Sequence, residues 1–157
     1  MTGHDSLGTR LILLATGGSA ALLAGAFGFQ ALGHAPCDLC LWQRWPHAAA
    51  VALGLIGLVL VSRTVPVALA ALAMAGSVGL GIYHTGVERH WWPGPASCTS
   101  GAIGGLSPED LMSRILAAPM VRCDEVSWSL LGLSMASWNA IASAVLAAIW
   151  LRALTRG

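Results

Sequence analysis

Long apolar stretches alternate with short polar segments along the chain. The apolar stretches are residues 11–32, 45–61, 65–83 and 135–151. A helix needs roughly 17–25 apolar residues to cross a bilayer, so each stretch is long enough for one membrane span. Glycine and alanine are frequent within them, which suits close helix packing in lipid. The pattern predicts an all-α membrane protein, a four-helix bundle forming a single domain over residues 1–157.

The polar segments 33–41 and 86–134 are expected to be loops on the same side of the membrane. Within the longer one, SPEDLMSRILAAP predicts a short amphipathic helix, because Ser107 and Asp110 form a Ser-x-x-acid capping box. Its apolar face comprises Leu111, Met112, Ile115 and Leu116. Such a helix is expected to lie in the membrane interface. Four tryptophans are expected as interfacial anchors: Trp91, Trp92, Trp128 and Trp138.

The composition agrees with a membrane location. Hydrophobic residues make up 56% of the chain and charged residues only 10%, whereas soluble domains carry about 25% charged residues. A soluble helical bundle would need polar outer faces, and the apolar stretches lack them. The formal net charge of +1 provides no basic surface for nucleic acid.

Arginine positions give a weak indication of orientation, since four arginines fall on each side of the predicted membrane. The short turn with Arg63 and the tail with Arg152 and Arg156 favour both termini inside. The loops on the other side then carry all the cysteines: Cys37, Cys40, Cys98 and Cys123. Disulfides persist in such an extracytoplasmic location.

The Cys37-x-x-Cys40 pair favours redox chemistry. A zinc site would prefer two closely spaced pairs, yet Cys98 and Cys123 are far apart in sequence. A c-type haem needs histidine where Leu41 stands. Two structural disulfides remain the main alternative, although a bridge between Cys37 and Cys40 would close too short a loop to stabilise much.

The residues after the cysteine pair add a charged face to the second span. Cys40, Gln43, Arg44 and His47 have the spacing i, i+3, i+4, i+7 and share one helical face. Cys40 also stands at a predicted helix N-terminus, where the dipole stabilises a thiolate. Arg44 either stabilises such an anion or anchors the span end in the interface. His84, at the outer end of the third span, has either a structural or a functional role.

Three segments carry a resemblance to a known family. PCDLCLWQRW, YHTGVERHWWPGPASC and RCDEVSWSLLGLSMASWN occur in this order among the apolar stretches. In this combination the chain resembles the DsbB family of quinone-dependent disulfide oxidases, over roughly Leu11 to Leu151. That system keeps the bacterial periplasm oxidising. The resemblance implies a multi-pass protein of the bacterial inner membrane, with its cysteines facing the periplasm and both termini in the cytoplasm.

The resemblance also implies an order of thiol exchange. A reduced periplasmic thioredoxin-fold oxidase of the DsbA type would attack a Cys98–Cys123 disulfide at Cys98. Cys123 would then attack Cys37, or the two pairs would exchange by a related route. Each step requires an accessible thiolate, which a long loop can present.

The electrons would leave the protein through Cys40 to a quinone of the membrane pool, ubiquinone or menaquinone. The resemblance places Arg44 beside that quinone, with His84 as a further neighbour. No metal is expected. The motifs do not distinguish a general thiol partner from a dedicated one, nor do they give the resting disulfide pattern.

Other classes of protein predict different behaviour. A vitamin K epoxide reductase-like enzyme would carry its Cys-x-x-Cys in a later span. A four-span transporter would be expected to hold an ionisable group within a span, and none of the predicted spans contains a carboxylate. A structural membrane subunit, whose disulfides only brace the outer loops, would keep its function without Cys37 or Cys40.

Overall fold

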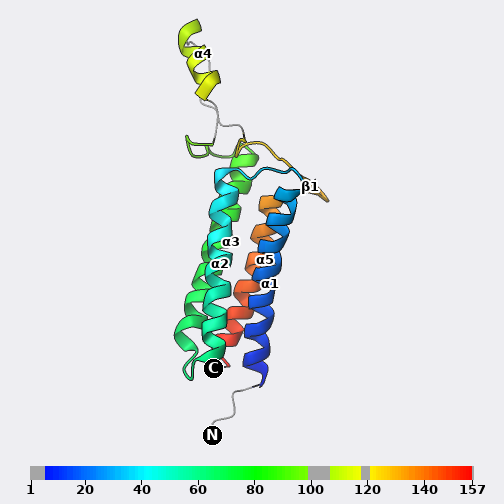
Figure 1. The fold of residues 1–157 in the computed structure, drawn as a ribbon, viewed down its shortest axis with the longest axis vertical. Coiled ribbons are helices and arrows are strands. Elements are labelled where there is room, and N and C mark those ends of the chain that lie inside the picture. The colour runs from blue at the N-terminus through cyan, green and yellow to red at the C-terminus, as the bar shows by residue number, and fades with distance from the viewer. Residues whose placement is uncertain (1–5, 99–106, 118–120, 157) are drawn as a thin grey trace.

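The computed structural model describes residues 6–98, 107–117 and 121–156. Four long helices run side by side along the molecule (Figure 1). They are α1 (Ser6–Ala31), α2 (Asp38–Val59), α3 (Thr64–Glu88) and α5 (Met135–Leu154). Contacts join α1 to α2, α2 to α3, α3 to α5 and α5 back to α1, which closes the bundle. The predicted helical architecture is therefore confirmed.

The helices begin and end at positions that differ from the predicted spans. α2 starts at Asp38 inside the predicted loop 33–41, because the side chain of Cys37 caps it by accepting a hydrogen bond from the Cys40 N–H at 3.3 Å. α3 continues to Glu88, past the predicted start of the second loop at residue 86. The cysteine pair thus lies on the first turn of α2 rather than in a free loop.

Three helices are long and apolar enough to cross a membrane: Leu7–Ala31, Thr64–Glu88 and Met135–Leu154. Within the described residues α2 is not among them. Its first half carries the polar side chains Gln43, Arg44 and His47, which lower its mean hydropathy. The outward faces of the bundle are rich in exposed apolar side chains, including Leu14, Leu55, Leu72 and Val145. Such surfaces suit a lipid environment.

Small residues allow close contact in the bundle interior. A Cβ atom added at Gly81 of α3 would lie 2.9 Å from the Cβ of Ala140 on α5 and 3.0 Å from its backbone nitrogen. The buried core is aliphatic around the large side chain of Trp150. This core lies toward the chain termini, while the buried polar residues Gln43, His47 and His84 lie nearer the other end.

The end of the bundle opposite the termini carries the connection from α1 to α2 and the segments between α3 and α5 (Figure 1). The short helix α4 (Pro108–Ala117) projects beyond this end. The predicted capping box is present, since Ser107 Oγ accepts from the Asp110 N–H at 3.2 Å and donates to its carboxylate at 2.9 Å. Met112 and Leu116 are exposed, and the side chains of Leu111 and Ile115 lie outside the described residues.

A small hairpin leads into α5 that the sequence pattern did not predict. Strands β1 (Ser129–Leu130) and β2 (Leu133–Ser134) pair antiparallel. Leu131 and Gly132 between them have φ values of 55° and 75°, as a two-residue turn of this handedness requires. Ser134 then caps α5 by accepting a hydrogen bond from the Ser137 N–H at 3.2 Å.

Candidate redox site and its cavity

The two cysteines of the Cys-x-x-Cys pair are in direct contact. Both are free thiols, and the sulfur atoms of Cys37 and Cys40 lie 3.0 Å apart, within hydrogen-bond distance. Cys37 is buried and Cys40 is half-buried. The thiol of Cys37 donates to Cys40 and lowers the pKa of Cys40 to about 7. The donor, Cys37, has its own pKa raised well above that of an ordinary thiol.

The other two cysteines form a disulfide beside this pair. Cys98 and Cys123 are bonded, with Cα atoms 5.3 Å apart. Both are buried, and they share one apolar cluster with Cys37, Leu39 and Val87. The long second loop therefore folds back over the first turn of α2. The family resemblance implied exchange between the two pairs, but residue spacing gave no sign of this shared cluster, because it depends on how the loop closes.

His84 reaches the same cluster from α3. Its Nε2 atom lies 3.6 Å from Cys37 Sγ and 3.9 Å from a carboxylate oxygen of Glu88. The ligand atoms of Cys37, Cys40 and His84 all lie within 4.8 Å of one another, close enough to hold a metal ion. Sequence spacing alone could not reveal that combination, since the histidine lies on another helix.

Arg44 is fixed against α1. Its guanidinium donates to Gln30 Oε1 at 2.8 Å and to the Ala26 carbonyl at 3.3 Å, and it lies 4.7 Å from the ring centroid of Phe27. Arg44 also lines a cavity, so its charge is held at a defined place in the cavity wall. These contacts hold the guanidinium of Arg44 more firmly than a role as an interfacial anchor requires.

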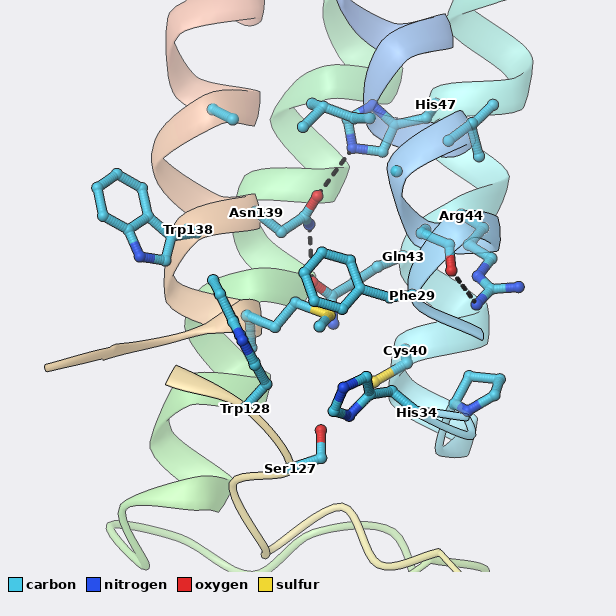
Figure 2. Close-up of a pocket in the computed structure, with 18 of the residues that line it drawn as sticks. Phe29, His34, Cys40, Gln43, Arg44, His47, Ser127, Trp128, Trp138 and Asn139 are labelled. Atoms are coloured by element: carbon cyan, nitrogen blue, oxygen red, sulfur yellow. Dashed lines mark hydrogen bonds between the residues drawn. The ribbon is translucent and has the colours of Figure 1, made fainter. Parts of the chain in front are cut away.

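The cavity has a volume of about 350 Å³ and lies between α1, α2, α5 and the segment that precedes β1. Its wall is largely apolar and includes Leu22, Phe29 and Trp128. The polar residues predicted to share one face of α2 all border it: Cys40, Gln43, Arg44 and His47. Figure 2 shows them along α2, with Asn139 of α5 next to Gln43 and His47. His84 borders the cavity as well.

Two of the predicted tryptophan anchors also belong to this wall. Trp128 packs edge-on against Phe29, with ring centroids 5.1 Å apart. Trp138 lines the cavity and donates to the Leu130 carbonyl at 3.1 Å. Trp92, by contrast, stacks on Tyr83 outside this cavity. The tryptophans thus divide between the cavity and the outer end of α3.

Comparison with known proteins assigns the chain to a family. The model of the family described as "Disulfide bond formation protein DsbB" matches residues 8–153. The chain belongs to the DsbB family. It is accordingly a mostly helical membrane protein of the disulfide bond formation class, and the resemblance seen in the sequence is confirmed.

Individual DsbB proteins match over most of their length. Disulfide bond formation protein B of Stutzerimonas stutzeri (strain A1501) is 30% identical over 161 residues, covering 93% of this chain and 94% of that protein. The protein of the same name from Polaromonas sp. (strain JS666 / ATCC BAA-500) is 27% identical and covers 99% and 96%. Disulfide bond formation protein B 2 of Pseudomonas aeruginosa is 34% identical over 113 residues, covering 68% and 66%. No solved structure gives a significant match.

We expect Cys40 to be the reactive thiol of the reduced pair. Because the pKa of Cys40 is about 7, its thiolate forms near neutral pH, and its rate of alkylation should fall about tenfold per pH unit below that value. Cys37, whose pKa is raised, should react far more slowly at neutral pH. Peptide mass spectrometry after iodoacetamide treatment over about pH 5–9 measures both rates.

The Cys37→Ala variant provides the control, because it removes the hydrogen-bond donor. The midpoint of Cys40 alkylation should then move to higher pH. Equal reactivity of the two cysteines, or an unchanged midpoint in the variant, would contradict this assignment.

Proposed function

We propose that this protein is a membrane disulfide oxidase that reoxidises a periplasmic DsbA-type oxidase and passes the electrons through two cysteine pairs to a membrane quinone. One observation carries the proposal: the Cys98–Cys123 disulfide belongs to the same buried cluster as Cys37, while Cys40 borders an apolar cavity. This arrangement supports a path with a protein thiol at one end and a lipid-soluble acceptor at the other.

Thiol–disulfide exchange can move two electrons along this path. A thiolate of the reduced partner attacks Cys98 and forms a mixed disulfide, which releases Cys123 as a thiolate. The partner's second thiol resolves that bond, so the partner leaves oxidised and the loop pair is reduced. The Cys123 thiolate then attacks Cys37 of a Cys37–Cys40 disulfide and releases the Cys40 thiolate.

Closure of the loop disulfide completes the internal transfer. Cys98 attacks Cys123 in the Cys37–Cys123 bond, which restores the Cys98–Cys123 disulfide and leaves Cys37 and Cys40 reduced. The bonded pair and the free pair of the structure correspond to this distribution of electrons. The lowered pKa of Cys40 favours its departure as a thiolate.

The cavity residues fit a quinone. The largely apolar wall suits a lipid-soluble ring, and Cys40 and Arg44 border the same space. A bound quinone, ubiquinone or menaquinone, would be the final oxidant, because it can accept two electrons and two protons. The permanent positive charge of Arg44 would stabilise the negatively charged oxygens of the reduced quinone. Its guanidinium is fixed by hydrogen bonds to Gln30 and Ala26. His84 is the further polar neighbour.

The proposal includes a location and a topology. Four spans would cross the bacterial inner membrane, with α2 as the least apolar of them. Both termini lie at one end of the bundle and the cysteines at the other (Figure 1), which supports cytoplasmic termini and periplasmic cysteines. The helix α4 would then lie on the periplasmic side, where its exposed Met112 and Leu116 suit the membrane interface.

The main alternatives are a transporter and a structural subunit whose disulfides only brace the outer loops. A bracing role does not explain why the Cys37-x-x-Cys40 pair lies between the loop disulfide and a cavity. A transporter function does not explain why the loop disulfide shares a buried cluster with Cys37. Both alternatives predict that turnover with a dithiol protein and a quinone is absent.

A quinone-reduction assay tests the proposal. Protein in detergent is given a reduced DsbA-type protein with ubiquinone or menaquinone, and the quinone absorbance is followed. We expect steady turnover that is abolished in the Cys98→Ser and Cys40→Ser variants, since each breaks one exchange step. The exposed Ser113→Ala change on α4 serves as the control and should keep full turnover. Absence of turnover with a folded protein and either quinone would refute the proposal.

A substitution at Arg44 separates quinone use from thiol exchange. We expect Arg44→Ala to raise the KM for quinone by about tenfold or more, since a hydrogen bond to a charged group contributes about 1.5–3 kcal/mol. The rate of mixed-disulfide formation with the partner should remain unchanged. Arg152→Ala, at the far end of the bundle, is the matched control. An Arg44 variant that loses partner exchange but keeps its quinone KM would contradict this role.

A further inference from the structure

A chain of side-chain hydrogen bonds leads through the bundle interior to Cys37. His47 Nε2 lies 3.0 Å from Asn139 Oδ1, and Asn139 Nδ2 lies 2.7 Å from Gln43 Oε1. Gln43 Nε2 lies 2.8 Å from His84 Nδ1, and His84 Nε2 lies 3.6 Å from Cys37 Sγ. Gln43, His47 and His84 are 6%, 3% and 2% exposed, and Asn139, at the centre of the chain, is half-buried beside the cavity.

One backbone group sets the direction of the whole chain. The carbonyl of Leu39 lies 3.2 Å from Gln43 Nε2, and a carbonyl can only accept. The NH₂ group of Gln43 must therefore face Leu39, which leaves its Oε1 atom to face Asn139. Asn139 then donates its own NH₂ to Gln43 and presents Oδ1 to His47, whose Nε2–H donates to it. Every amide and ring orientation follows from this single carbonyl.

The direction determines which nitrogen of His84 carries a proton. Its Nδ1 atom accepts from Gln43, so the neutral ring must be protonated at Nε2, the atom that faces Cys37. We infer that Gln43 is a positioning residue for the reaction at Cys37: fixed by the Leu39 carbonyl and by Asn139, it holds His84 as the Nε2–H tautomer, with the N–H on the side of the Cys37 sulfur. All the donors in the chain point the same way, so each bond polarises the next.

The fixed tautomer decides between two uses of the site. A metal ion bound by Cys37, Cys40 and His84 would need the lone pair of Nε2, which the tautomer replaces by a proton. The same proton stabilises negative charge on Cys37 Sγ, which that sulfur acquires when it leaves during exchange. This chain of hydrogen bonds therefore favours donation from His84 Nε2–H to the Cys37 sulfur over metal binding.

The inference rests on the proposed exchange at Cys37, but its measurements do not require turnover. Protein labelled with ¹⁵N-histidine is examined by long-range ¹H–¹⁵N NMR, and the His84 signals are assigned by their loss in a His84→Gln variant. We expect the Nε2–H tautomer in the parent protein. In Gln43→Leu, which removes the donor to Nδ1, we expect a mixture of tautomers.

Ser143→Ala is the matched control, because Ser143 contacts His47 Nε2 at 3.3 Å without linking it to Gln43. It should leave the tautomer unchanged. If Gln43→Leu fails to fold, Gln43→Met also removes the donor and carries the same expectation. A parent protein protonated at Nδ1, or an unchanged tautomer in a folded Gln43→Leu or Gln43→Met variant, would overturn the inference.

A second readout follows the sulfur itself. In a Cys40→Ala background, alkylation of Cys37 below its pKa should slow by about tenfold when Gln43→Leu is added, the change for a shift of about one pKa unit. The charged groups Glu88, Arg122 and Glu125 also border the space beside Cys37, and the Gln43 change leaves them in place. An unaltered alkylation rate of Cys37 would contradict this inference even if the quinone assay shows turnover. The inference and the proposed function can therefore fail separately.

Discussion

Polar groups inside this bundle must find their hydrogen-bond partners within the protein, because the surrounding faces are apolar. That constraint organises the cysteine end of the molecule. α2 carries Gln43 and His47 toward the interior, and their partners come from α3 and α5. The bonds bring His84 and Asn139 to fixed positions, and the chain they form ends at the Cys37 sulfur. The same interactions that hold the helices in register thus prepare the thiol pair.

The cysteine pair occupies a boundary between two environments. On one side the second loop brings the Cys98–Cys123 disulfide into the same buried cluster as Cys37. On the other side Cys40 and Arg44 border a cavity with a largely apolar wall. The proximity of the two cysteines lowers the pKa of one and raises that of the other, so they are chemically distinct despite their similar positions. Membership of the DsbB family agrees with this division.

Much of the fold could be predicted from local sequence patterns. The apolar stretches predicted the long helices, and Ser107 with Asp110 predicted the capped start of α4. The spacing of the polar residues on α2 predicted that they share one helical face, and this face borders the cavity. The sequence placed Cys40 at a helix N-terminus, but the cap by Cys37 was missed, because a cysteine side chain is an unusual helix cap. The β1–β2 hairpin was missed because its strands are too short to show alternation.

The site itself could be predicted only in part, since its geometry depends on contacts between distant segments. The approach of the loop disulfide to Cys37 leaves no local signal, nor does the convergence of Asn139 and His84 on Gln43. The sequence predicted Trp128 as an interfacial anchor, and it gave no sign that this ring also packs on Phe29 in the cavity wall. Each of these features is set by helix packing and loop closure rather than by residue spacing.

The central claim is that electrons cross from the loop pair to the pair on α2. Protein stripped of quinone, with both disulfides formed, is mixed with one equivalent of a reduced DsbA-type protein and quenched with an alkylating reagent. The account predicts label on Cys37 and Cys40, with Cys98 and Cys123 still bridged, which is the distribution seen in the structure. Label confined to Cys98 and Cys123 would show that the pairs do not exchange and would contradict it.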